Sequence, residues 1–373
     1  MSYISPTFNL ALFSPFTLLP QIEETEGILI GEDTYRRKIY LNYKRLPNFH
    51  GIIIGPTGSG KSTTVESLLY DLVQHHINVI CIDPHQDYVS AINDLNGVTI
   101  DLTSKIPDPF EIPGKLSDAT ISMWADYLSM AAKYSVNLSE MQTSILKLII
   151  EENIRENKDI YNLINELEAR RVESPILEDL YIRCRDLFRY FCKHNFSIID
   201  VVNSKKPASI IFTSNGKKLP FFIEKFAALL LINQINEYKM LFTNFSERHS
   251  VELIVVVDEA WRLLKMPGYD VDFLYRLREM RKFGVGYWII IQSATDLPTE
   301  AYEQVGFILA LSGPQLHVSK VDAISKLSRY DIEWLRFNRR PGYGVLIRMG
   351  YPKASQIVIK IKDEVLRRRV GGS

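Results

Sequence analysis

The stretch Gly51-Ile-Ile-Ile-Gly-Pro-Thr-Gly-Ser-Gly-Lys-Ser62 joins a short apolar run to a glycine-rich turn. Residues 55–62 match the pattern G-x-x-x-x-G-K-[ST] at every fixed position, and residues 62–76 continue with apolar side chains at helical spacing. In such a loop, glycines let backbone N–H groups turn toward phosphate oxygens, and the following helix presents its positive end to them. The alternative is a glycine turn that matches by chance, but the flanking strand and helix favour a phosphate-binding loop.

The pattern assigns a role to each part of this loop. Lys61 would contact the β- and γ-phosphates, and the Ser62 hydroxyl would bind Mg²⁺. The candidate nucleotide-binding residues are Gly55, Pro56, Thr57, Gly58, Ser59, Gly60, Lys61, Ser62 and Thr63.

Working outward, the apolar run at 79–82 predicts a second buried strand and hence a parallel sheet. Residues 27–43 predict a β-hairpin, and residues 115–195 contain helical stretches without a convincing strand. One of these helices begins at a capping box formed by Ser139 and Gln142. Further strands are predicted at 209–213, 253–257, 287–291, 307–311, 344–349 and 356–361, and further helices at 222–240 and 270–282.

These elements predict an α/β protein with a mainly parallel central sheet and an all-helical insertion. We divide the chain into an N-terminal β segment (1–50), a core (51–114 and 196–369), the helical insertion (115–195) and a tail (370–373).

A pair of carboxylates follows the predicted strand at 253–257. Asp258 and Glu259 would lie at the carboxyl edge of the sheet, where ligands of open α/β sheets bind. Asp258 would hold Mg²⁺ through water, and Glu259 would accept a proton from an attacking water molecule. The alternative is a pair of acidic residues that complement a helix dipole.

Two further features follow along the chain. Gln292 ends an apolar strand and could sense the γ-phosphate or position the water, or it is an ordinary polar strand end. A group of cations precedes it, and one arginine of this group could act as an arginine finger that reaches a neighbouring subunit's nucleotide. The alternative for each is a solvated helix face. The group consists of Arg262, Lys265, Arg276, Arg278, Arg281 and Lys282.

The segment Asp83-Pro-His-Gln-Asp-Tyr88 also follows a predicted strand at the carboxyl edge. One interpretation is a loop that lies near the nucleotide or near a neighbouring subunit. The other is a plain turn, in which Pro84 ends the preceding strand. The sequence leaves these alternatives open.

The composition excludes some classes of protein. The 373 residues contain 44 Lys and Arg against 44 Asp and Glu, which excludes a polybasic nucleic-acid binder. Residues 319–369 nevertheless hold 13 basic and 5 acidic residues, interspersed with aromatic ones, and form either a DNA-facing surface or a solvated or inter-subunit face. Three cysteines, no basic amino-terminal region and no apolar run of about 20 residues predict a cytoplasmic protein without a membrane span or lipid anchor.

Taken together, four segments resemble the HerA–FtsK superfamily of ring-forming, DNA-translocating ATPases over residues 27–361. The segments are Asn48-Phe-His-Gly-Ile-Ile-Ile-Gly-Pro-Thr-Gly-Ser-Gly-Lys-Ser62, Ile82-Asp-Pro-His-Gln-Asp-Tyr88, Val257-Asp-Glu-Ala-Trp261, and Arg278-Glu-Met-Arg-Lys-Phe-Gly284 with Gln292.

The resemblance implies a RecA-like P-loop NTPase fold, ATP and Mg²⁺ as cofactors, a homohexamer and double-stranded DNA as the substrate track. It implies the roles given above for Lys61, Ser62, Asp258, Glu259 and Gln292, and it makes Arg281 the first choice for the finger.

Two departures from the HerA pattern bear on the partners. Only about 50 residues precede the glycine-rich loop, too few for a small β-barrel, and Gln86-Asp87 stands where Gly-Glu is frequent. These departures favour a plasmid, viral or conjugation-linked relative at least as much as HerA itself. The partners could then be membrane components of a conjugative secretion system, with the protein peripheral at the membrane, or a nuclease, as for HerA. The alternative to a DNA translocase is an ATPase that powers assembly or protein export and handles no DNA.

Overall fold

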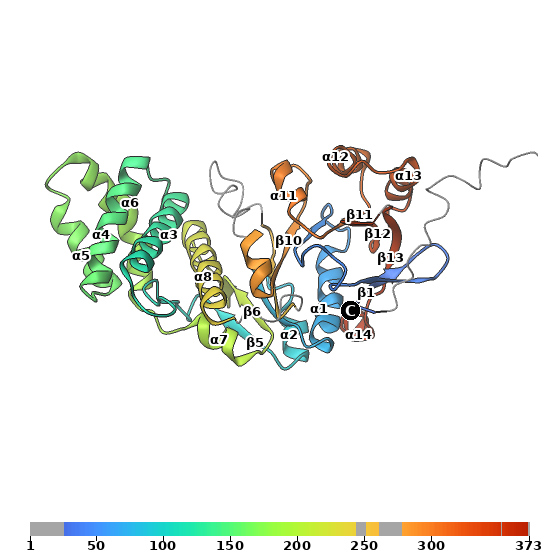
Figure 1. Cartoon of the computed structure of the whole chain (residues 1–373), viewed down its shortest axis with the longest axis horizontal. Coiled ribbons are helices and arrows are strands. Elements are labelled where there is room, and N and C mark those ends of the chain that lie inside the picture. The colour runs from blue at the N-terminus through green and yellow to red at the C-terminus, as the bar shows by residue number, and fades with distance from the viewer. Residues whose placement is uncertain (1–25, 244–250, 261–277, 352, 372–373) are drawn as a thin grey trace, which may run out of the picture.

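The computed structural model describes residues 26–243, 251–260, 278–351 and 353–371. Its main feature is an 11-stranded sheet (Figure 1). Across the sheet the strands follow in the order β2 (Lys38–Leu41), β1 (Ile28–Glu32), β13 (Ser355–Ile359), β12 (Tyr343–Arg348), β11 (Phe307–Leu311), β3 (Gly51–Ile54), β10 (Val285–Ile291), β9 (Leu253–Val257), β4 (Asn78–Asp83), β6 (Ala208–Ile211) and β5 (Val98–Asp101).

The strands from β11 to β5 are parallel, and β12, β13, β1 and β2 extend the sheet in antiparallel pairs. The predicted mainly parallel sheet is therefore confirmed. The central strands β3, β9, β10 and β11 are buried along their whole length, which explains why their sequences are continuous apolar runs rather than alternating ones.

Alternate residues of these strands belong to two cores. Ile53 and Val256 pack with Leu68 and other residues of α1 (Lys61–Gln74). Their neighbours, such as Ile54 and Val257, pack on the other face with α8 (Phe221–Phe242). Successive strand side chains point to opposite faces, so one set of strands holds both layers of helices in place.

A bundle of four helices lies beyond α8, at the end of the molecule opposite to β13 (Figure 1). Its first helix packs against α8 and connects the bundle to the sheet. The capping box of Ser139 and Gln142 is present at the start of the second helix, as predicted. The helices are α3 (Asp118–Val136), α4 (Glu140–Arg155), α5 (Ile160–Arg170) and α6 (Pro175–Phe191).

The remaining described elements are short. They are α2 (Val89–Asp94), α7 (Ile198–Ser204), β7 (Thr213–Ser214), β8 (Lys217–Lys218), the 3₁₀ turn η2 (Arg281–Phe283), α11 (Thr299–Glu303), α12 (Gln315–Ser325), α13 (Arg329–Phe337) and α14 (Asp363–Gly371).

Two details bear on the divisions made from the sequence. The hairpin β1–β2 pairs through β1 with β13, so residues 28–41 continue the central sheet. Helix α14 runs to Gly371, so the assumed tail at 370–373 begins inside a helix. Strand β5 was not predicted, because its four residues Val-Thr-Ile-Asp carry too short a pattern.

Candidate nucleotide-binding site

The glycine-rich loop after β3 bends sharply into the start of α1. Gly58 and Gly60 have φ angles of 81° and 95°, a conformation that residues with a side chain rarely adopt. A Cβ atom on Gly55 would lie 2.3 Å from the hydroxyl oxygen of Ser59, so this position has no space for a side chain. The loop therefore depends on its glycines for conformation at two positions and for space at a third.

The start of α1 is suited to an anion. No side chain caps this end, and its first turn has no acidic residue. The first hydrogen bond within the helix runs from the Thr64 N–H to the Gly60 carbonyl at 2.8 Å, so the N–H groups of Lys61, Ser62 and Thr63 precede the helical hydrogen-bond pattern. Such N–H groups attract phosphate oxygens, and this donor set fits the phosphates of a nucleotide.

Lys61 folds back over the loop. Its Nζ atom donates to the carbonyl oxygens of Gly55 at 2.6 Å and Pro56 at 3.2 Å. Burial lowers the pKa of Lys61, while the carboxylates of Asp258 and Glu259 favour its charged form. An ammonium bonds more strongly to a charged acceptor than to a carbonyl, so this lysine is suited to a phosphate ligand.

Asp258 is buried at the end of β9, next to β4. Its carboxyl oxygens accept hydrogen bonds from the Tyr88 hydroxyl at 3.1 Å and from the Glu259 N–H at 2.8 Å. Burial, together with the nearby carboxylates of Asp83 and Asp87, raises the pKa of Asp258 to about 7. A divalent cation would favour the ionised form. Together with the Ser62 hydroxyl, Asp258 offers the oxygen ligands that Mg²⁺ prefers.

Gln292 connects the glycine-rich loop to Glu259. Its side-chain Nε2 donates to the Glu259 carboxylate at 2.7 Å, and its Oε1 accepts from the Thr57 hydroxyl at 3.4 Å. This bridge exists because β10, which ends just before Gln292, lies between β3 and β9 in the sheet. Glu259 itself has a φ of 49°, a conformation that costs energy in a residue with a side chain and is found at functional sites.

Arg281 lies at the other edge of the sheet. Its guanidinium donates to the Pro47 carbonyl at 2.8 Å, close to the amino-terminal end of β3, and Arg278 donates to the Gln304 side chain at 2.6 Å. Both arginines are exposed. The length of β3, about 13 Å at 3.3 Å per residue, separates them from their own glycine-rich loop. Arg262, Lys265 and Arg276 lie outside the described residues.

The loop after β4 contributes side chains to the site. The sequence had left open whether this loop lies near the nucleotide or is a plain turn. Asp83 accepts hydrogen bonds from the N–H groups of Asp87 and Tyr88 and from the Ser209 hydroxyl, each at 2.9 Å. Burial raises the pKa of Asp83 to about 6. The Ser62 hydroxyl donates to the Asp87 carboxylate at 2.5 Å. In the sequence, the position of this loop directly after a buried parallel strand indicated that it could lie at the site. That position alone could not exclude a plain turn.

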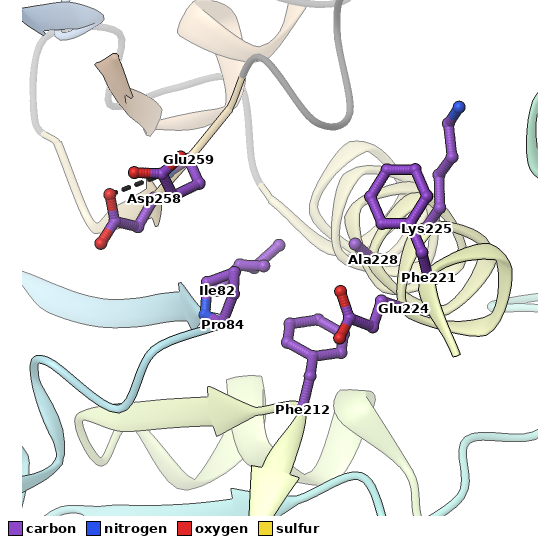
Figure 2. A pocket seen from close by; sticks show the side chains of 9 residues that line it. All are labelled: Ile82, Pro84, Phe212, Phe221, Glu224, Lys225, Ala228, Asp258 and Glu259. Atoms are coloured by element: carbon purple, nitrogen blue, oxygen red, sulfur yellow. Dashed lines mark hydrogen bonds between the residues drawn. The ribbon is translucent and has the colours of Figure 1, made fainter. Parts of the chain in front are cut away.

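A small hollow lies beside the acidic pair, between β4 and α8 (Figure 2). Phe212 and Phe221 line it, and Glu224 points into it, whereas the ammonium group of Lys225 points away. Burial lowers the pKa of Lys225 to about 8. This hollow is mostly apolar, and no residue of the glycine-rich loop lines it.

The basic carboxyl-terminal segment is partly neutralised within the molecule. Lys362 pairs with Asp71 at 2.5 Å, and Arg368 and Arg369 pair with Glu66 at 3.3 and 3.1 Å. Both acidic residues lie on α1. These ion pairs hold α14 against α1. The positive charges in this part of the segment are therefore paired within the molecule and do not form a free basic surface.

Other residues of this segment have different surroundings. Arg348 is half-buried and stacks on Tyr351, and the half-buried Trp334 donates to the Gly344 carbonyl. Phe337 is exposed, with the Arg336 guanidinium over its ring.

The turn that follows α13 contacts the glycine-rich loop. The Gly342 N–H donates to the Ser59 carbonyl at 3.2 Å. The exposed Arg339 and Arg340 precede this contact, so the basic end of α13 is attached to the loop.

Residues 27–215 match the sequence family described as the central domain of the helicase HerA. The chain belongs to this family. It is also 24% identical over 279 residues to the DNA import protein CedB of Sulfolobus acidocaldarius, an alignment that covers 73% of this chain and 45% of CedB. The chain spans less than two thirds of the length of the curated relatives it matches. The resemblance to the HerA–FtsK superfamily is thereby confirmed.

Solved structures agree on the fold of this HerA-family chain. VirB4 of Thermoanaerobacter pseudethanolicus superposes with a TM-score of 0.74 at 17% identity, covering 91% of this chain and 98% of that one. The plasmid coupling protein TrwB, in complex with ADP and Mg²⁺, superposes with a TM-score of 0.64 at 13% identity, covering 91% of each chain. The fold is that of the RecA-like P-loop NTPases. Each helix in the part of the chain that the structure describes is too short or too polar to span a bilayer.

Proposed function

We propose that this chain binds ATP with Mg²⁺ at the carboxyl edge of its sheet and hydrolyses it to ADP and phosphate. Lys61 and the N–H groups at the start of α1 would bind the phosphates, and Ser62 and Asp258 would hold the cation. When bound, Mg²⁺ supplies positive charge that neutralises the phosphate oxygens.

Glu259 accepts a proton from the attacking water molecule in this proposal. Gln292 holds the Glu259 carboxylate in place, and through its contact with Thr57 it would couple the position of that carboxylate to the conformation of the glycine-rich loop. The observation that carries the proposal is the hydrogen-bonded path from Thr57 through Gln292 to Glu259. Because the path joins the phosphate-binding loop to the candidate base, a change at the phosphates would be transmitted to the group that activates water.

We further propose that the protein works as a homohexameric ring that translocates double-stranded DNA. Membership in the HerA family and the similarity to CedB support this proposal. The placement of Arg281 supports it too, since this exposed arginine lies too far from its own glycine-rich loop to reach a nucleotide there, but it is free to face another subunit. Arg281 would then be a finger supplied in trans.

The exposed end of α13 is our candidate for DNA contact. Arg336 and Arg339 form hydrogen bonds with neutral acceptors, the Gln315 side chain and the Arg336 carbonyl, so their charges are available to phosphates. Replacing both with alanine should weaken duplex binding across all sequences and reduce its dependence on salt.

The test is ATP hydrolysis measured with and without duplex DNA, alongside particle mass from light scattering. We expect hydrolysis that requires Mg²⁺, rises with duplex DNA and is lost in Lys61→Ala, from a particle of about six subunits. A monomer whose turnover is indifferent to DNA would contradict the translocase.

A second candidate is an ATPase that powers assembly or protein export without handling DNA. The superposition on VirB4, which covers 91% of this chain, favours keeping this candidate. Retained hydrolysis, no duplex binding at low salt, and co-purification with membrane components would support it. In either case we place the protein in the cytoplasm, where it could associate peripherally with a membrane. A nuclease partner, as for HerA, is a further proposal.

A further inference from the structure

Asp87 lies within the proposed nucleotide site, although no pattern in the sequence assigned it a role there. Its Oδ2 atom accepts a hydrogen bond of 2.5 Å from the hydroxyl of Ser62. Ser62 is the second residue of α1, and Asp87 comes from the loop after β4. Two segments that meet only in the folded chain thus join a carboxylate to the hydroxyl proposed to bind the cation.

The loop is constructed to hold Asp87 in this place. The buried carboxylate of Asp83 accepts the N–H groups of Asp87 and Tyr88, one with each oxygen. Gln86 has a φ of 63°, and its side chain is anchored on the Thr213 carbonyl. Tyr88 is fully buried and reaches Asp258 with its hydroxyl. Anchors on both sides therefore fix the backbone of the loop at Asp87.

The direction of the Ser62–Asp87 hydrogen bond has a chemical consequence. A serine hydroxyl has one proton and two lone pairs. When the proton points to Asp87, the lone pairs are left for a cation, and the nearby negative charge makes the oxygen a better ligand. Carboxylates that orient a metal ligand in this way usually change metal affinity by about 10- to 100-fold when they are removed.

We infer that Asp87 is a positioning residue for the Mg²⁺ that accompanies the nucleotide, acting through the Ser62 hydroxyl. The inference rests on the proposed function, because it assigns a role within that ATP site. It makes the loop after β4 a third wall of the site, beside the glycine-rich loop and the acidic pair at the end of β9.

The test separates the charge of Asp87 from its hydrogen bond. Asp87→Asn can still accept from Ser62 but lacks the charge, whereas Asp87→Glu keeps the charge. ADP affinity is measured by calorimetry in excess Mg²⁺ and again in EDTA, with circular dichroism confirming that each variant is folded. The ratio of the two affinities reports the cation and not the nucleotide alone.

We expect Asp87→Asn to reduce this ratio about 10-fold or more, with ADP affinity in EDTA unchanged or higher because a negative charge is gone. Asp87→Glu should recover part of the ratio. His85→Ala, which alters an exposed side chain of the same loop, is the control and should leave the ratio unchanged.

An equal loss of ADP affinity with and without Mg²⁺ in Asp87→Asn would overturn the inference and assign Asp87 a structural role. That outcome would leave the proposed function intact. A wild-type protein whose ADP affinity is the same in Mg²⁺ and in EDTA would instead overturn the proposed site as a whole, and the inference with it.

Discussion

The carboxyl and amino edges of the central sheet differ in how they hold their charged groups. At the carboxyl edge, Asp83 and Asp258 are buried, and burial raises the pKa values of both carboxyls. At the amino edge, Arg278 and Arg281 are exposed and donate to neutral oxygen atoms. The carboxyl edge therefore contains buried carboxyl groups whose ionised forms are unfavourable without a cation. The amino edge contains solvent-exposed guanidinium groups that already form hydrogen bonds.

This difference fits our proposal, in which the carboxyl edge binds the nucleotide and an arginine of the amino edge acts on another subunit. Burying a carboxylate without a cation is unfavourable, so the Mg²⁺ that we propose to bind at the carboxyl edge would stabilise this edge. An exposed arginine bound to a carbonyl can leave that partner at a cost of about 1 kcal/mol. The amino edge is thus suited to a transient contact with a second subunit.

The largest expected effect concerns the amino edge. Arg281→Ala should lower ATP turnover of the assembled protein about 10³-fold, because an arginine finger supplies an effect of that order. Mixing Arg281→Ala with Lys61→Ala should restore part of the activity, since one interface can then combine an intact loop with an intact arginine. Arg278→Ala is the matched control and should keep most of the activity.

A fully active Arg281→Ala protein would show that the amino edge does not reach another subunit's nucleotide through this residue.

The next effect compares two glutamates near opposite ends of one strand. Glu259→Gln should lower turnover about 10²-fold, as for loss of a general base, while ADP affinity is retained. Glu252 precedes β9 at its other end and pairs with Lys239, so Glu252→Gln should leave turnover unchanged. Hydrolysis assays and ADP titration of both variants distinguish the two edges. Unchanged turnover in Glu259→Gln would show that another group activates the water.

A smaller effect is expected on stability. Asp258→Asn removes a carboxyl that is buried without a cation, so the nucleotide-free variant should have a higher Tm at pH 8, by about 2 °C for each kcal/mol relieved. Differential scanning calorimetry measures this. Asp126→Asn, which alters an exposed carboxylate paired with Lys147, is the control and should shift Tm by less than about 1 °C.

The pH dependence of that gain follows from the raised pKa of Asp258. Between about pH 4 and pH 7 the folded wild type holds a proton that the unfolded chain has released, so its stability falls as pH rises through this range. Asparagine does not titrate, and the advantage of the variant should be largest above pH 7 and disappear near pH 4. A gain independent of pH would show that the carboxyl is not the cause.

The smallest effect tests how the carboxyl edge is built. Gln86 has a φ of 63°, where a side chain costs about 1 kcal/mol relative to glycine. Gln86→Gly and Gln86→Ala both lose the anchor on Thr213, but only the alanine keeps the strain. Denaturant unfolding should therefore find the glycine variant more stable by about 1 kcal/mol. The opposite order would mean that the loop relaxes out of this conformation.

Particular elements show how far sequence patterns reach. The apolar runs at 51–54, 253–257 and 307–311 predict strands that the structure has with the same bounds, because a buried parallel strand needs an unbroken apolar sequence. Strand β5 was missed, since four residues at the margin of a sheet leave no distinct period. The hairpin β1–β2 was predicted, but its attachment to β13, more than 300 residues later, follows from no local pattern.

The basic segment at 319–369 shows the same limit for charge. Its excess of positive residues is visible in the sequence, but Lys362, Arg368 and Arg369 pair with α1, a helix some 300 residues earlier. Composition records the number of charges and not their partners, so the surface available to a nucleic acid is smaller than the count indicates.

For this protein the sequence by itself determined the phosphate-binding loop and its place between a strand and a helix, because glycine conformation and helix start are local properties. It also determined that an acidic pair and a polar amide follow apolar strands. Only the tertiary structure decided that β10 lies between β3 and β9, which puts Gln292 between Thr57 and Glu259, and that Asp87 meets Ser62. Strand order and loop contacts arise from packing between distant segments, and no local pattern of residues encodes them.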